Sequence, residues 1–71
     1  MQRQNVVSSN IKSIGYDPIR PTLEVEFKNG SIYQYFGVPQ HLYQGLMQAS
    51  SHGEYLDAYI KKGGYSYVRA L

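Results

Sequence analysis

Two short runs of β-favouring residues flank the dipeptide Asn29-Gly30 and form the clearest pattern of hydrophobic and polar positions in the chain. Together they span Thr22 to Gly37, with the sequence TLEVEFKNGSIYQYFG. A two-residue turn of this kind needs positive φ at both central positions, which Asn followed by Gly adopts at little cost. The segment is therefore predicted to be a β-hairpin whose register places Lys28 opposite Ser31.

This register divides the hairpin into two faces, because successive side chains of a strand point to opposite sides. The face predicted to be buried carries, with the polar exception of Gln34, the apolar residues Leu23, Val25, Phe27, Ile32 and Phe36. The face predicted to be wet or half covered carries Glu24, Glu26, Lys28, Ser31, Tyr33 and Tyr35. Two tyrosines are thus expected beside two carboxylates, on the side of the sheet away from the core.

A further strand is predicted before the hairpin, over residues 11–16 (IKSIGY). Ile11 and Ile14 are three residues apart, so a regular strand would place them on opposite faces. Gly15 beside them indicates a β-bulge that would turn both isoleucines inward. The chain begins with a polar stretch without periodicity, and residues 1–7 are predicted to be a flexible N-terminal segment.

Two amphipathic helices are predicted after the hairpin. Pro39 suits the first turn of a helix, and from there apolar residues recur at spacings of three and four to about Ala49. A second helix follows to about Lys62, because Ser51 and Glu54 have the spacing of a capping box.

The order of elements is three strands, two short helices and a tail (YSYVR) that alternates like a strand or an extended arm after the Gly-Gly pair at 63–64. The predicted fold is an α+β domain over residues 8–71. It has a three-stranded antiparallel meander with a central β-hairpin, covered on one face by two short C-terminal helices. The helix residues expected in the core are Leu42, Leu46, Leu56 and Ile60.

Composition narrows the classes of function. A chain of 71 residues forms one small domain with a limited core, and the lack of cysteine removes disulfides and thiolate chemistry. No apolar run has the length of a signal peptide or a membrane span, so a cytoplasmic protein is predicted. The net charge of +2 is mild, and the Lys and Arg residues are dispersed rather than clustered as in many nucleic-acid binders.

Several segments together resemble the KTSC domain: SSNIKSIGYD, LEVEF, YQYFGVP, the spaced Tyr43, Leu46 and Ala49, and SHGEYLDAYI. The resemblance covers about Ser8 to Leu71. The family is named after the C-terminal region of some lysyl-tRNA synthetases and also occurs as small single-domain proteins of bacteria and their phages. The resemblance implies the α+β fold predicted above and, because the family occurs in lysyl-tRNA synthetases, RNA binding. Its central Tyr-x-Tyr falls on Tyr33 and Tyr35.

Tyr33 and Tyr35 are the first candidates for a binding site. They could form a stacking platform for unpaired bases, or they could cover the sheet and contact a protein. Glu24 and Glu26 are expected to lie opposite them and would repel phosphate. The structural or protein-contact interpretation is therefore favoured.

The C-terminal segment holds a second, basic and aromatic group: Lys61, Lys62, Tyr65, Tyr67 and Arg69. Its lysines could meet phosphates while bases stack on its rings. Alternatively, the lysines stabilise the negative end of the helix dipole and a tyrosine docks the tail on the sheet, and this interpretation is favoured.

No catalytic or metal site is predicted. His41 and His52 lack the spacing of a nucleophile triad or a metal-ligand set, and Asp17 and Glu54 do not form an evident acid pair. Gly63-Gly64 follows a helix instead of opening one, which excludes a phosphate-binding glycine loop. Neither an enzymatic activity nor a cofactor is expected.

The predicted function is a small non-catalytic binding module, which contacts a protein or a second copy of itself through a tyrosine-rich surface. A phage-encoded modulator of a host protein would fit this description. If the tail crosses the outer face of the sheet, it would bring its cations to Glu24 and Glu26. The alternative is an RNA-binding accessory domain, and no membrane or small-molecule partner is predicted.

Overall fold

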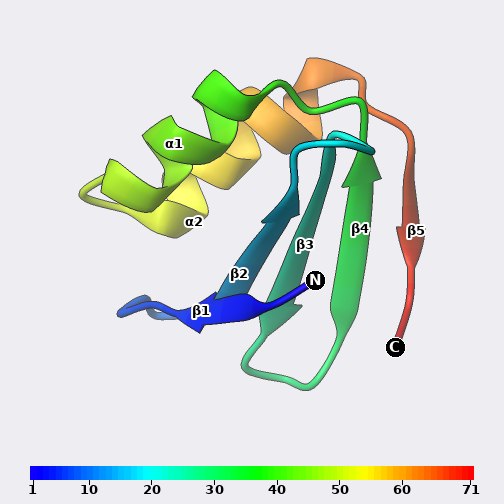
Figure 1. Ribbon diagram of the computed structural model, residues 1–71. Helices are drawn as coiled ribbons and strands as arrows, with labels where there is room; N and C mark the ends of the chain where they lie inside the picture. The colour runs from blue at the N-terminus through cyan, green and yellow to red at the C-terminus, as the bar shows by residue number, and fades with distance from the viewer.

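The computed structural model describes residues 1–71 and shows a five-stranded antiparallel sheet with helices packed on one face (Figure 1). The strands, which lie side by side in chain order, are β1 (Arg3–Asn5), β2 (Ile11–Asp17), β3 (Thr22–Phe27), β4 (Ile32–Phe36) and β5 (Tyr67–Arg69).

The α+β class is confirmed, whereas the three-stranded sheet is wrong. Both ends of the chain add a short edge strand, including part of the N-terminal segment that was expected to be flexible. The alternation of the tail was compatible with a strand, but strands of three residues are too short for the pattern to indicate which strand they pair with.

The predicted helices are present. The first is α1 (Gln40–Gln48), which begins directly after Pro39. The second is divided into α2 (His52–Tyr55), the π-helical turn η1 (Leu56–Ile60) and the 3₁₀ turn η2 (Lys61–Gly63). The Ser51 hydroxyl accepts a hydrogen bond from the Glu54 N–H at 3.3 Å, which is one half of the expected capping box. Gly64 ends the helical segment with φ +81°.

The hairpin turn differs from the prediction. The Gly30 N–H donates to the Phe27 carbonyl at 3.0 Å, and the Phe27 N–H donates to the Ser31 carbonyl at 2.9 Å, which encloses a three-residue loop. Only Gly30 in this loop has positive φ (+93°), as in a type I turn followed by a glycine bulge. The Asn29 side chain instead accepts hydrogen bonds from the Ser31 N–H (3.0 Å) and hydroxyl (2.7 Å). The expected two-residue turn is therefore wrong.

One additional loop residue shifts the register by one and exchanges the two faces of β4. Tyr35 lies opposite Leu23 and Tyr33 opposite Val25, so both tyrosines are on the core face. Tyr35 is 4% exposed, while the neighbouring Phe36 points to the outer face and is 38% exposed. The placement of both tyrosines outside the core, and of Phe36 inside it, is wrong.

Other residues of β4 change face for the same reason, and Ile32 moves to the outer face. Phe27 of β3 stays on the core face, as predicted, but is only half buried. Gln34, the polar exception on the predicted core face, is on the outer face, where its amide donates to Glu24 at 2.8 Å. The prediction that residues of β4 alternate between the two faces was correct. The prediction of which residues face the core was wrong.

The predicted bulge in β2 is confirmed, although it lies at Lys12. It brings both Ile11 and Ile14 to 0% exposure. Gly15 has another role, because a Cβ atom there would come within 2.8 Å of the Gln2 carbonyl oxygen in the chain that leads into β1.

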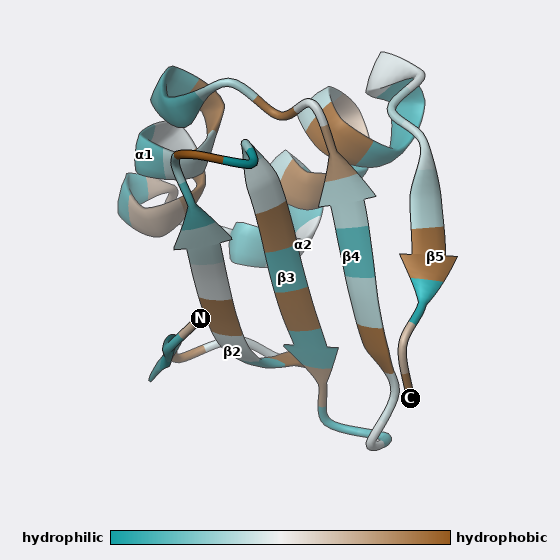
Figure 2. Cartoon of the chain, turned by 45° about the vertical axis from the view of Figure 1, so that its right-hand side comes forward, coloured by the Kyte–Doolittle hydropathy of each residue, from teal (hydrophilic) through white to brown (hydrophobic).

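The core lies between the sheet and the helices. Its buried members are Ile11, Ile14, Leu23, Val25, Tyr35, Val38, Leu46, Leu56 and Ile60. Alternating hydrophobic and hydrophilic bands along β3 show how this strand presents one face to the core (Figure 2). Of the four helix residues predicted in the core, Leu42 is half buried and the others are fully buried. None of the helices has the length and apolar character needed to cross a lipid bilayer.

Candidate binding site

A cleft of about 580 Å³ opens on the helix side of the sheet, next to the hairpin loop. We call it the tyrosine cleft, and its lining residues are Ser9, Asn10, Phe27, Lys28, Asn29, Ser31, Tyr33, Tyr35, Lys61, Tyr65 and Tyr67. They come from the loop before β2, the β3–β4 hairpin, the end of the helical segment and the C-terminal tail. The hairpin register is what positions the two tyrosines of β4 here.

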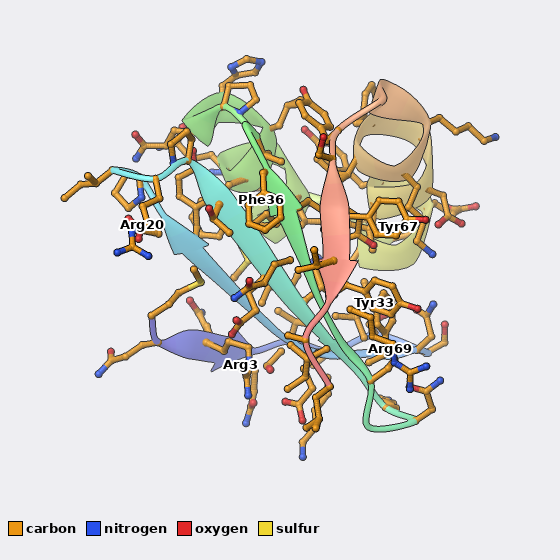
Figure 3. The ribbon with its side chains drawn as sticks, turned by 90° about the vertical axis from the view of Figure 1, so that its right-hand side faces the viewer. Arg3, Arg20, Tyr33, Phe36, Tyr67 and Arg69 are labelled. Atoms are coloured by element: carbon orange, nitrogen blue, oxygen red, sulfur yellow. The ribbon has the colours of Figure 1, made fainter.

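Aromatic rings form one continuous wall of the tyrosine cleft. The Tyr33 ring centre lies 6.4 Å from that of Tyr35, 6.1 Å from that of Tyr67 and 5.8 Å from that of Phe27, which it meets edge-on. Viewed along the β5 edge, Tyr33 and Tyr67 extend to one side of the sheet and Phe36 lies on the other (Figure 3). Faces of such rings can accept a flat ligand by stacking.

Tyr65 reaches the cleft because of the two glycines before it. Gly64 has φ +81°, a conformation that other residues adopt only at a cost, and it turns the chain back toward β4. The Tyr65 ring then packs on Gly63, where a Cβ atom would lie 2.7 Å from a ring carbon. The Gly-Gly pair thus both ends the helical segment and positions a cleft residue.

Two lysines supply positive charge to the cleft. The Lys61 ammonium lies 5.3 Å from the centre of the Phe27 ring and 3.2 Å from the Asp57 carboxylate. Lys28 is exposed in the hairpin loop. No acidic residue and no histidine is among the lining residues.

The carboxylates of β3 lie on the opposite face of the sheet. Arg3 of β1 contacts Glu24 at 2.5 Å and Glu26 at 3.7 Å, and the Ser13 hydroxyl donates to Glu26 at 2.8 Å. Burial of the Glu24 carboxyl opposes its ionisation, but hydrogen bonds from Gln34 and Arg3, with the Arg3 charge, outweigh burial and lower its pKa.

The expected position of these carboxylates is therefore wrong. Glu24 and Glu26 do not flank the cleft tyrosines, because the register separates them. The question of where the tail lies is also answered, because the tail does not cross the outer face. It pairs with β4 as an edge strand, and Arg3 provides the positive charge.

The Tyr35 hydroxyl stays protonated at neutral pH. Burial, followed by the proximity of Tyr33, Tyr67 and Asp57, raises the pKa of Tyr35 to about 12. Tyr35 therefore contributes an uncharged side chain to the aromatic wall.

Most of the candidates predicted from sequence come together in the cleft, namely Tyr33, Tyr35, Lys61, Tyr65 and Tyr67. Arg69 lies opposite Tyr33 in β5, and its guanidinium donates to the Leu71 carbonyl at 3.1 Å. Lys62 is exposed and does not line the cleft.

The sequence reasoning missed the other six lining residues, which are Ser9, Asn10, Phe27, Lys28, Asn29 and Ser31. Phe27 was expected to be buried in the core, and Lys28 was assigned to the outer face of a strand instead of to the loop. The sequence signal that could have indicated these two residues was the position of the hairpin loop, which directly precedes the tyrosines of β4. The histidines lie elsewhere: Nδ1 of His52 is 2.7 Å from the Leu46 carbonyl oxygen, which links the two helices, and His41 is exposed in α1.

Comparison with known proteins agrees with this fold. The family model of the KTSC domain matches residues 7–65. The chain belongs to the KTSC domain family. In structure, this KTSC domain is similar to a KTSC domain protein from Yersinia pestis, with a TM-score of 0.89 and 45% identity over 99% of this chain and 97% of the other.

The sequence relatives are of two kinds. An uncharacterized protein of Stutzerimonas stutzeri is 41% identical over 69 residues, which cover 97% of each chain. A lysine–tRNA ligase of a Nostoc species is 44% identical over 59 residues, which are 83% of this chain but only 10% of the ligase. The KTSC domain is thus found both alone and as a small part of a large enzyme.

Proposed function

We propose that this KTSC domain is a non-catalytic binding module whose tyrosine cleft binds single-stranded RNA. The observation that carries the proposal is the convergence of four tyrosines, Phe27 and two lysines in one cleft without an acidic lining residue. Proteins that bind single strands combine cations for the phosphates with aromatic rings on which bases stack. The relatedness to part of lysine–tRNA ligases, which act on an RNA, supports the choice of RNA.

The corrected register changes the balance between RNA and protein as partners. The objection to RNA was that Glu24 and Glu26 would lie beside Tyr33 and Tyr35. Arg3 holds both carboxylates on the other face, so Glu24 and Glu26 do not repel phosphate at the cleft.

The test is the anisotropy of a fluorescently labelled single-stranded RNA titrated with the protein. Tyr67→Ala removes an exposed ring of the cleft, and stacking on such a ring contributes about 1–3 kcal/mol per base, so affinity should fall about tenfold or more. Tyr59→Ala is the matched control, because Tyr59 is an exposed tyrosine outside the cleft. Equal affinities of the two variants would contradict the proposed site.

The salt dependence provides a second measurement. Each phosphate contact on a single strand contributes about 0.7 to the slope of log affinity against log salt, so Lys28 and Lys61 together predict about 1.4. Lys61→Gln should lower this slope by about 0.7. Lys62→Gln, a change in the adjacent lysine outside the cleft, should leave it unchanged.

A protein partner is the second candidate, and the exposed edge strand β5 is the observation that favours it. The two candidates are separated by a pull-down from bacterial lysate with and without nuclease. If a protein is retained equally after nuclease treatment, and Tyr67→Ala does not affect RNA binding, the protein-interaction function replaces the RNA-binding function.

A further inference from the structure

Strand β5 leaves one edge of the sheet with unpaired backbone groups. The Phe36 N–H donates to the Ser66 carbonyl at 2.8 Å, and the Ala70 N–H donates to the Ile32 carbonyl at 2.7 Å. In an antiparallel ladder, the residues between such positions turn their N–H and C=O groups alternately to either side. The backbone N–H and C=O groups of Val68 therefore point toward β4. The same groups of its two neighbours in β5 point away from the sheet.

These outward neighbours are Tyr67 and Arg69. No strand follows β5 in the sheet, and Figure 1 shows it at the open right-hand edge. All three residues of β5 are exposed, with Tyr67 at 62% and Val68 at 46%. Each of the two outward residues offers one donor and one acceptor in a strand without a partner.

The edge is complementary to itself. If two β5 strands pair antiparallel about Val68, each Tyr67 lies directly opposite Arg69 of the second copy, and these pairs can form four backbone hydrogen bonds. Both side chains point to the cleft face, since they lie opposite Tyr35 and Tyr33 in the sheet. A guanidinium beside a tyrosine ring adds a cation–π contact, and on the outer face the two Val68 side chains meet.

We propose that β5 is a self-association surface, through which two copies of this chain join their sheets into one continuous ten-stranded sheet. The contact is closed by two-fold symmetry. It brings the two tyrosine cleft openings to the same face of the joined sheet and places Arg69 of the second copy at the rim of each. The proposal does not depend on the nature of the cleft ligand. The short strand makes the dimer weak, with an association that depends on concentration.

Sedimentation equilibrium from micromolar to millimolar concentration tests the proposal. Wild-type protein should show a reversible monomer–dimer equilibrium. Val68→Glu and Val68→Lys each place like charges opposite each other on the two-fold axis, so each variant alone should associate at least tenfold more weakly. An equimolar mixture of the two should recover the dimer, since opposite charges then meet.

Two further variants show whether the edge itself is responsible. Val7→Glu introduces the same charge at an exposed position near the opposite edge, and it should dimerise like the wild type. Arg69→Pro removes an outward N–H without removing a bond to β4, and it should weaken the dimer. Circular dichroism confirms that each variant is folded.

The proposal is overturned if wild-type protein stays monomeric over the whole range, or if Val68→Glu associates as strongly as Val7→Glu. Species larger than a dimer would also overturn it. They would indicate head-to-tail pairing of β5 with β1 of another copy, which does not close.

Discussion

At the residue scale, Asn29 and Gly30 decide which face of the sheet carries the tyrosines. The sequence Asn-Gly is compatible with two kinds of turn that differ by one loop residue. In the structure, only Gly30 adopts positive φ, and Asn29 uses its side chain to hold the Ser31 backbone and hydroxyl. The site therefore depends on a local choice between turn types.

Replacing Asn29 distinguishes the two turns by stability. In a two-residue turn with positive φ at both positions, Asn29→Gly would be neutral or stabilising, because glycine adopts that conformation more easily. In the observed loop the change removes two hydrogen bonds, so it should destabilise the protein by about 1 kcal/mol. Urea unfolding measures the difference, with Asn29→Asp as the control that keeps the acceptor oxygen. A stabilised Asn29→Gly variant would contradict the observed loop.

The buried Tyr35 hydroxyl predicts a loss of stability at alkaline pH. Its pKa of about 12 in the folded protein exceeds the ordinary value of 10.0, so the folded state holds its proton more tightly than the unfolded state. This contribution is fully present below about pH 10 and is lost as the pH rises toward about 12. Tyr35→Phe should flatten the fall in stability over this range, measured by urea unfolding at several pH values. An unchanged fall would assign the alkaline sensitivity to other groups.

At the element scale, the structure shows that the alternation of β4 and its phase are separate properties. Five residues with alternating polarity suffice to predict a strand, but Gln34, Tyr33 and Tyr35 can each occupy either face. The phase was assigned from the turn, and the error moved every side chain of β4 together. Strand β3 has no comparable ambiguity, because Leu23 and Val25 allow only one buried face.

Alanine substitutions at two adjacent positions of β4 test its phase. Tyr35→Ala removes a buried ring and should cost about 3–5 kcal/mol of stability. Phe36→Ala removes a ring on the outer face and should cost about 1 kcal/mol or less. Denaturant unfolding of both variants provides the comparison, and the reverse order of the two effects would restore the register predicted from the sequence.

At the scale of the whole molecule, charge is segregated between the two faces of the sheet. Lysines border the aromatic cleft on one face, while Glu24 and Glu26 are held by Arg3 on the other. Arg3 and Glu24 are 21 residues apart in sequence, so only the pairing of β1 with β2 brings them together. The N-terminal strand therefore contributes indirectly to the character of the cleft.

The Arg3–Glu24 contact predicts a dependence of stability on acidic pH. The pKa of Glu24 is lowered in the folded protein, so the stabilising contribution is present above its ordinary value of 4.5 and is lost as the pH falls through the lowered value. Arg3→Gln should therefore reduce stability at pH 6 and should reduce the further loss on acidification. Lys12→Gln is the control, because Lys12 is 3.9 Å from Glu26 and largely exposed. Equal pH profiles for wild type and Arg3→Gln would contradict the assignment.

The sequence by itself determined the α+β class, the central hairpin, both helices and five of the eleven residues that line the tyrosine cleft. These features follow from local periodicity, helix termini and turn residues, which depend on neighbours along the chain. Tertiary structure decided the phase of β4, the two edge strands and the separation of Glu24 from Tyr33. The phase of β4 follows from the loop between β3 and β4, because Asn-Gly is compatible with two loop lengths. The edge strands depend on pairing between distant segments, whose backbone hydrogen bonds are available to any residue type. The cleft is therefore encoded in the sequence by its residues, and only strand pairing assembles it.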